Sequence, residues 1–167
     1  MTDERQITRM LHDEHVGAIA TLERLEGLLA RHSPKKIPDP SRPEVKTTLA
    51  EVAAMCESDL AVHFGFEEDN LFPRLAEWGD SPISQILTSE HRLILPMGTR
   101  MAELAREALE NGFSADSWVE FRRSGGELVE RLIVHIQKEE MGLLPALDEL
   151  LETEQDWKLA ESYAAGR

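Results

Sequence analysis

Two stretches of this sequence follow one pattern, HFGFEEDNLFP at residues 63–73 and HIQKEEMGLLP at residues 135–145. Each places a glutamate four residues after a histidine. Residues four apart on an α-helix lie within about 40° of each other and one turn apart. His63 with Glu67, and His135 with Glu139, can therefore each aim an imidazole and a carboxylate at one point. Such mixed ligands are typical of iron, manganese or zinc, and unlike the all-oxygen sites of calcium and magnesium.

The repeat is larger than these two stretches. Glu14-His15 precedes the first copy and Glu90-His91 precedes the second, so each half reads Glu-His, a connection, and then His-x3-Glu-Glu. This arrangement predicts two similar helical hairpins that face each other across a pseudo-twofold axis.

Helix signals dominate the rest of the chain. Helix-breaking residues fall in four places, at 31–43, 77–82, 110–116 and Thr153. Between them, apolar residues recur at three- and four-residue spacing, with one histidine on each apolar face. The four helical segments run roughly over 3–31, 44–76, 83–110 and 116–151. We therefore predict an all-α, up-and-down four-helix bundle.

The chain has 167 residues, which is enough for one domain with a substantial core. The bundle accounts for about 3–151, and the tail at about 153–167 is compatible with a short fifth helix. In that helix, Trp157 and Leu159 would pack against the bundle.

Several helix-weakening residues test this prediction. Pro96 should kink the third helix, and Pro73 and Pro145 should bend or end theirs. Gly125 on the fourth helix and Gly98 on the third either let helices approach closely or leave a small channel. Both alternatives remain open at the level of sequence.

The four inward histidines should lie at one height in the bundle. His15 and His63 are each about twenty residues from the connection that joins their helices, and His91 and His135 are likewise equidistant from theirs. Two buried glutamates without compensation would each cost several kcal/mol, whereas metal coordination removes that cost. Two ions bridged by carboxylates suit this number of ligands. The candidate metal ligands are His15, His63, Glu67, His91, His135 and Glu139.

Other polar residues near this layer have more ordinary interpretations. His12 is either an additional ligand or a residue outside the ligand set. Glu68 and Glu140 point about 100° away from the neighbouring ligand glutamates, so we expect them to be charge-paired or solvated. The same expectation applies to Glu14 and Glu90.

Composition excludes several partners. The chain has 32 acidic and 18 basic residues and a formal charge of −14, which repels nucleic acid and anionic membranes. Its apolar runs are too short to span a bilayer, and no signal-peptide pattern begins the sequence, so we expect a cytoplasmic protein. The single cysteine, Cys56, cannot pair within the chain, and core packing is its expected role.

The residues DEH (13–15), HFGFEEDNLFP (63–73), SEHR (89–92) and HIQKEEMGLLP (135–145) resemble the hemerythrin-like family of HHE cation-binding domains. The resemblance implies a non-haem di-iron centre with an oxo or hydroxo bridge, in which the four histidines are terminal ligands. Glu67 and Glu139 would bridge the irons, and zinc or manganese could substitute for iron.

One departure from that family bears on function. Oxygen-carrying hemerythrins have a second histidine one turn further along the third helix, where this chain has Leu95. The resemblance then implies a centre that binds or reacts with dioxygen, nitric oxide or peroxide in sensing or stress handling. Three alternatives stay open: a di-iron oxygenase or oxidase with an organic-substrate pocket near Gly98 and Leu95, an iron donor for iron-sulfur cluster repair, and a module in which metals only stabilise the bundle. The sequence leaves open whether the protein is an enzyme and identifies no catalytic residue; an enzyme of this kind would be a di-iron oxidoreductase.

Overall fold

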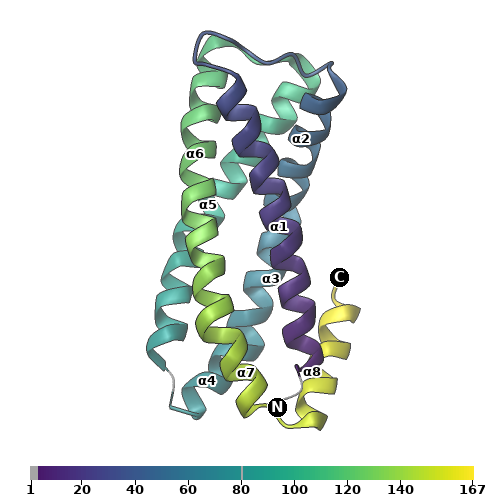
Figure 1. Cartoon of the computed structure of the whole chain (residues 1–167), viewed down its shortest axis with the longest axis vertical. Helices are drawn as coiled ribbons and strands as arrows, with labels where there is room; N and C mark the ends of the chain where they lie inside the picture. The colour runs from purple at the N-terminus through teal and green to yellow at the C-terminus, as the bar shows by residue number, and fades with distance from the viewer. Residues whose placement is uncertain (1–3, 80) are drawn as a thin grey trace.

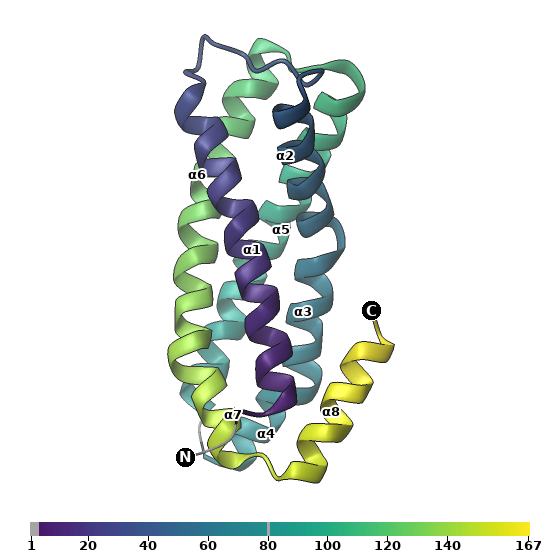
Figure 2. The same ribbon diagram turned by 45° about the vertical axis from the view of Figure 1, so that its right-hand side comes forward.

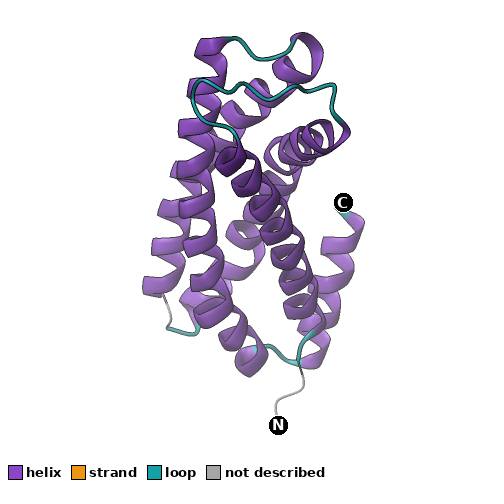
Figure 3. Ribbon diagram, turned by 45° about the horizontal axis from the view of Figure 1, so that its top comes forward, coloured by secondary structure: helices purple, strands orange, loops and turns teal. Residues whose placement is uncertain are grey.

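A computed structural model describes residues 4–79 and 81–167, and this part of the chain contains helices and loops but no strand (Figure 3). The elements are α1 (Gln6–Arg31), α2 (Pro43–Ala54), α3 (Leu60–Phe66), α4 (Phe72–Glu77), α5 (Ser81–Asn111), α6 (Ala115–Lys138), α7 (Leu144–Leu150) and α8 (Thr153–Ala165). Turns of π-helix at Met55–Asp59, Glu67–Leu71 and Glu139–Leu143 join α2 to α3, α3 to α4, and α6 to α7.

The helices form four long rods that alternate in direction (Figure 1). α1 is the first rod, α2 to α4 the second, α5 the third, and α6 with α7 the fourth. This confirms the predicted all-α bundle. None of the helices in the described ranges is both long and apolar enough to cross a membrane.

The two copies of the motif each contain a π-helical turn. The N–H of Phe72 bonds the carbonyl of Glu67, and the N–H of Leu144 bonds that of Glu139, both across five residues. A proline follows directly in each copy, at Pro73 and at position 145. Because proline lacks an N–H and crowds the carbonyl four residues earlier, a widened turn accommodates it. The rods therefore continue past both prolines.

The other helix-weakening residues are also tolerated. α5 continues through Pro96, which lies on the exposed side of the helix. A Cβ on Gly125 would lie 3.2 Å from Met101 Cε, and one on Gly98 would lie 3.5 Å from Leu60 Cδ1. Both glycines therefore serve close helix packing, and neither opens a channel.

The apolar core is divided in two along the bundle. One cluster, which includes Trp118 and Phe121, fills the end near the α1–α2 connection, and the other, which includes Leu11 and Leu147, fills the opposite end. Cys56 belongs to the first cluster, and burial raises the pKa of its thiol to about 12. It packs as a small apolar residue, as predicted, and the candidate metal ligands lie between the two clusters.

The C-terminal tail forms the fifth helix, α8, beside the N-terminal half of α1 (Figure 2). Leu159 is buried as expected, but Trp157 is 54% exposed, so its predicted packing was wrong. Asp156 takes the inward position instead. Its carboxylate accepts hydrogen bonds from the backbone N–H groups of Gln6 and Ile7, both at 2.9 Å, and so caps α1.

Replacing Asp156 by alanine is expected to destabilise the protein by about 1–2 kcal/mol, the usual cost of losing a helix cap. α1 has no capping side chain of its own at Arg5, so its first N–H groups would lose their partner. Urea unfolding of the metal-free protein measures the change. Glu154→Ala is the matched control because Glu154 is exposed on the same helix; equal stability of the two variants would contradict the capping role.

Candidate metal centre

Four histidines, one from each rod, point their Nε2 atoms into the gap between the two apolar clusters. His15 and His63 bring these nitrogens to 3.3 Å from each other, and His91 and His135 bring theirs to 3.2 Å. Two nitrogens bound to one ion at about 2.1 Å can be at most about 4.2 Å apart. Each pair therefore fits a common ion.

Glu67 and Glu139 lie between the two histidine pairs. One oxygen of Glu67 is 2.9 Å from His63 Nε2, and its other oxygen is 3.3 Å from His91 Nε2. One oxygen of Glu139 is 2.7 Å from His15 Nε2, and the other is 2.5 Å from His135 Nε2. Each carboxylate thus offers one oxygen to each pair, which is the arrangement of a bridging ligand.

The ligand atoms form two groups that could each hold a metal ion, and both glutamates belong to both groups. The first group is His15, His63, Glu67 and Glu139, and the second is Glu67, His91, His135 and Glu139. The structure thus brings together all six residues that the sequence singled out.

Burial supports metal binding by these residues. The six side chains belong to residues that are at most 7% exposed, and both glutamates are fully buried. Both oxygens of Glu67 and one of Glu139 have no hydrogen-bond partner of suitable geometry. Because unpaired buried carboxylate oxygens are costly, cations at these two positions fit the donor set.

Four glutamates, here called the outer glutamates, contact the Nδ1 side of the histidines: Glu14, Glu68, Glu90 and Glu140. Two of them bind a histidine of their own hairpin. Glu14 accepts from His63 Nδ1 at 3.1 Å, and Glu90 accepts from His135 Nδ1 at 2.9 Å. With the proton on Nδ1, the lone pair of Nε2 faces the centre.

The other two outer glutamates bind across the hairpins. Glu68 accepts from His91 Nδ1 at 2.9 Å, and Glu140 accepts from His15 Nδ1 at 2.6 Å. His12 lies outside both candidate groups and contacts Glu140 at 2.9 Å. It therefore supports a partner of His15 from the outer side.

These contacts revise the interpretation of the four outer glutamates. Glu14 and Glu90 are charge-paired as expected, with Arg167 and Lys138. All four glutamates in addition orient a candidate ligand, which was not expected. The available signal was the repeat itself, since Glu-His and Glu-Glu recur at equivalent places in both halves. The repeat does not show which histidine each glutamate contacts, because that depends on which histidine the neighbouring rod places beside it. The sequence of a single helix carries no information about its neighbours.

The carboxylates control the protonation of the metal-free centre. Burial lowers the pKa of His63, but Glu67, Glu139 and Glu14 outweigh burial and hold the pKa well above its usual value. For Glu139, burial raises the pKa, but the four imidazoles around its carboxylate lower the pKa well below its usual value. These shifts favour an ionised Glu139 beside a protonated His63 in the metal-free centre.

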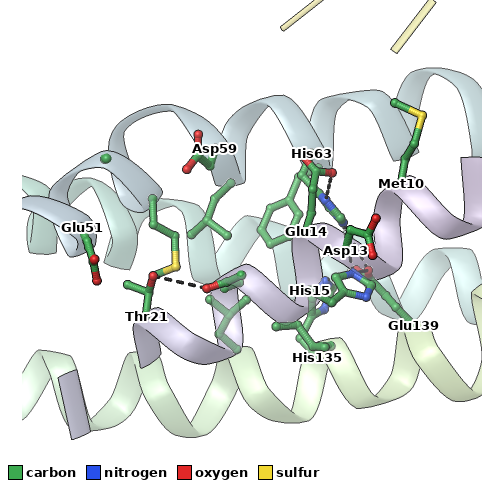
Figure 4. A pocket seen from close by; sticks show the side chains of 18 of the residues that line it. Met10, Asp13, Glu14, His15, Thr21, Glu51, Asp59, His63, His135 and Glu139 are labelled. Atoms are coloured by element: carbon green, nitrogen blue, oxygen red, sulfur yellow. Dashed lines mark hydrogen bonds and ion pairs between the residues drawn. The ribbon is translucent and has the colours of Figure 1, made fainter. Parts of the chain in front are cut away.

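The two histidine pairs have different surroundings. The ring of Phe64 stacks on His91 with centroids 3.7 Å apart, and Phe72 lies 5.7 Å from the same imidazole. A cavity of about 620 Å³ is instead lined by His15, His63 and His135, and it runs between α1, the second rod and α6 (Figure 4). Small molecules can therefore approach the His15–His63 position more readily than His91.

This cavity is not where the sequence suggested. The oxygenase alternative called for a substrate pocket near Gly98 and Leu95. Gly98 instead packs against Leu60, and Leu95 packs against the apolar cluster near the α1–α2 connection. The observed cavity extends from His15 toward Thr21 at its other end (Figure 4). Leu95 also supplies no nitrogen, so each candidate ion position has two histidines.

Comparison with known families agrees with this geometry. The model of the hemerythrin HHE cation binding domain matches residues 6–147. No curated protein matches the sequence. The family match and the two candidate groups together support a metal-binding protein.

Proposed function

Because the chain belongs to the family of hemerythrin HHE cation-binding domains, we propose that it holds two non-haem iron ions that bind or react with dioxygen, nitric oxide or peroxide. Its role would lie in sensing or in handling oxidative or nitrosative stress. His15 and His63 would hold one ion, and His91 and His135 the other. Glu67 and Glu139 would bridge the two.

The number of ligands carries this proposal. Each candidate position has two imidazole nitrogens and two carboxylate oxygens. Iron commonly binds five or six donors, so four protein donors leave room for an exogenous ligand. The cavity is lined by both histidines of one position, His15 and His63, but by only one histidine of the other, His135, which supports entry at the first position.

The surrounding residues support the same role. When bound, a pair of irons supplies electrons to a small ligand. The outer glutamates hold the imidazole tautomers so that Nε2 faces the centre. Phe64 covers His91 and shields that side from water. The protein's contribution is thus to orient nitrogen donors and to leave one side accessible.

Metal analysis with optical spectroscopy tests the proposal. Protein expressed with supplemental iron is expected to contain two irons per chain. Its visible absorption should change when azide is added to the oxidised protein or nitric oxide to the reduced protein. Iron-free, colourless protein from such expression would contradict the proposal. Protein with two irons and a spectrum insensitive to every small ligand would instead support a purely structural role for the metal.

The size of the cavity favours one second candidate, an oxygenase or oxidase of an organic substrate. About 620 Å³ exceeds the needs of a diatomic molecule and falls within the usual range of organic-ligand sites. Apolar side chains such as Leu60, Leu132 and Ile136 form part of its wall. Oxygen consumption that depends on an added organic compound would distinguish this candidate from sensing.

A further inference from the structure

Helix α8 reaches the candidate metal centre although it lies beyond residue 147, where the family match ends. Tyr163 is only 2% exposed, and its ring packs 4.4 Å from that of Phe66. The Tyr163 hydroxyl donates a hydrogen bond to Oε2 of Glu14. This same oxygen accepts from His63 Nδ1 at 3.1 Å.

A second residue of the C-terminus completes this contact. Arg167 forms an ion pair with Oε1 of Glu14, and its guanidinium carbon lies 5.4 Å from the centroid of the Tyr163 ring. Glu14 therefore has partners on both oxygens, namely Tyr163 and His63 on one and Arg167 on the other. Its position is set by three groups, two of which come from outside the four-rod bundle.

Glu14 also differs from the other outer glutamates in exposure. Its side chain is 16% exposed, compared with 22%, 31% and 39% for Glu90, Glu140 and Glu68. A less exposed carboxylate has less water to replace a lost partner. The hydrogen bond from Tyr163 therefore matters more at Glu14 than an added donor would at an exposed carboxylate.

We propose that Tyr163 is a positioning residue for the ion held by His15 and His63. By fixing Glu14, the hydroxyl fixes the Nδ1–H tautomer and the ring orientation of His63, and so aims Nε2 at the ion. Outer partners of this kind commonly contribute about 10–100-fold to metal affinity. The inference rests on metal binding as proposed above, but not on the identity of the metal.

Titration of the metal-free protein with Co²⁺ tests this role, because its visible absorption reports ligand geometry. The wild type should bind two ions. Tyr163→Phe keeps the aromatic packing. In this variant the ion at His15 and His63 should bind about 10–100-fold more weakly, and the affinity for the ion at His91 and His135 should be unchanged. Trp157→Phe is the matched control, because Trp157 is exposed on the same helix; it should titrate like the wild type.

Two further measurements separate positioning from a general loss of stability. In the Zn²⁺-loaded protein, ¹⁵N NMR should show faster exchange of the His63 ring N–H in Tyr163→Phe, with the His91 N–H unaffected. In a Glu14→Ala background, Tyr163→Phe should change affinity little further, because the hydroxyl acts through Glu14.

Three outcomes distinguish the possible failures. Equal binding of two ions by Tyr163→Phe and wild type would overturn the inference and leave the metal centre intact. Equal weakening of both ions would also overturn it. A wild-type protein that binds no metal would remove the proposed function itself.

Discussion

Alanine in place of Glu139 is expected to remove both metal ions rather than one. Its two oxygens face different histidine pairs, at 2.7 Å from His15 Nε2 and 2.5 Å from His135 Nε2. Both positions therefore lose a donor in this single change. We expect each affinity to fall by more than about 100-fold, beyond the range typical of an outer partner. Metal content after dialysis, together with Zn²⁺ titration calorimetry, measures the loss.

His15→Ala is the matched control for Glu139→Ala. His15 belongs to only one of the two candidate groups, so this variant should keep one ion, between His91 and His135. Helix content by circular dichroism verifies that both variants fold. Retention of two ions by Glu139→Ala would show that this carboxylate is not shared, and the two-ion arrangement would then be wrong.

Raising the pH is expected to destabilise the metal-free protein. Burial lowers the pKa of His91, but the carboxylates of Glu139 and Glu67 outweigh burial and raise it from 6.5 to about 9. A raised histidine pKa stabilises the fold fully below the unfolded value and loses this effect as pH rises through the folded value. The contribution of His91 should therefore disappear between about pH 6.5 and 9. A shift of this size corresponds to at most about 3 kcal/mol.

Bound metal should reverse this dependence. Metal ions bind the neutral imidazole, so binding releases protons and becomes tighter as pH rises. Urea unfolding at pH 6.5, 7.5 and 9, with a chelator or with saturating Zn²⁺, compares the two states. His91→Gln should reduce the loss in the metal-free protein, and His32→Gln, outside both candidate groups, should not. Stability of the metal-free protein that stays constant or increases toward pH 9 would contradict the proposed charge state of the centre.

Periodicity explains why the bundle and the six candidate ligands could be predicted. A histidine and a glutamate four residues apart share a helix face whatever surrounds the helix. Two residues that are equally far in sequence from the loop joining their antiparallel helices also lie at the same height along the bundle. Helix spacing alone was enough to predict the pairs His63–Glu67 and His135–Glu139. The structure brings both pairs together with His15 and His91.

Contacts at the sides of the helices could not be predicted in the same way. Glu68 and Glu140 lie at the borders between rods, where the partner depends on which residue the next rod presents. The cavity depends similarly on how α1 approaches the second rod, so the place near Gly98 that was considered for an oxygenase was wrong. The π-helical turns at both motifs are also a product of the folded chain, although Pro73 and Pro145 signalled a disturbance there.

Amino-acid order alone thus determined a helical bundle with six candidate ligand residues facing inward, because helix geometry relates residues that are close in sequence. Only the tertiary structure decided which carboxylate supports which histidine and that α8 reaches the centre through Tyr163 and caps α1 through Asp156. Asp156 and Tyr163 lie about 150 residues from their partners Gln6 and Glu14. No local period relates such distant residues, so these contacts follow from the packing of the complete chain.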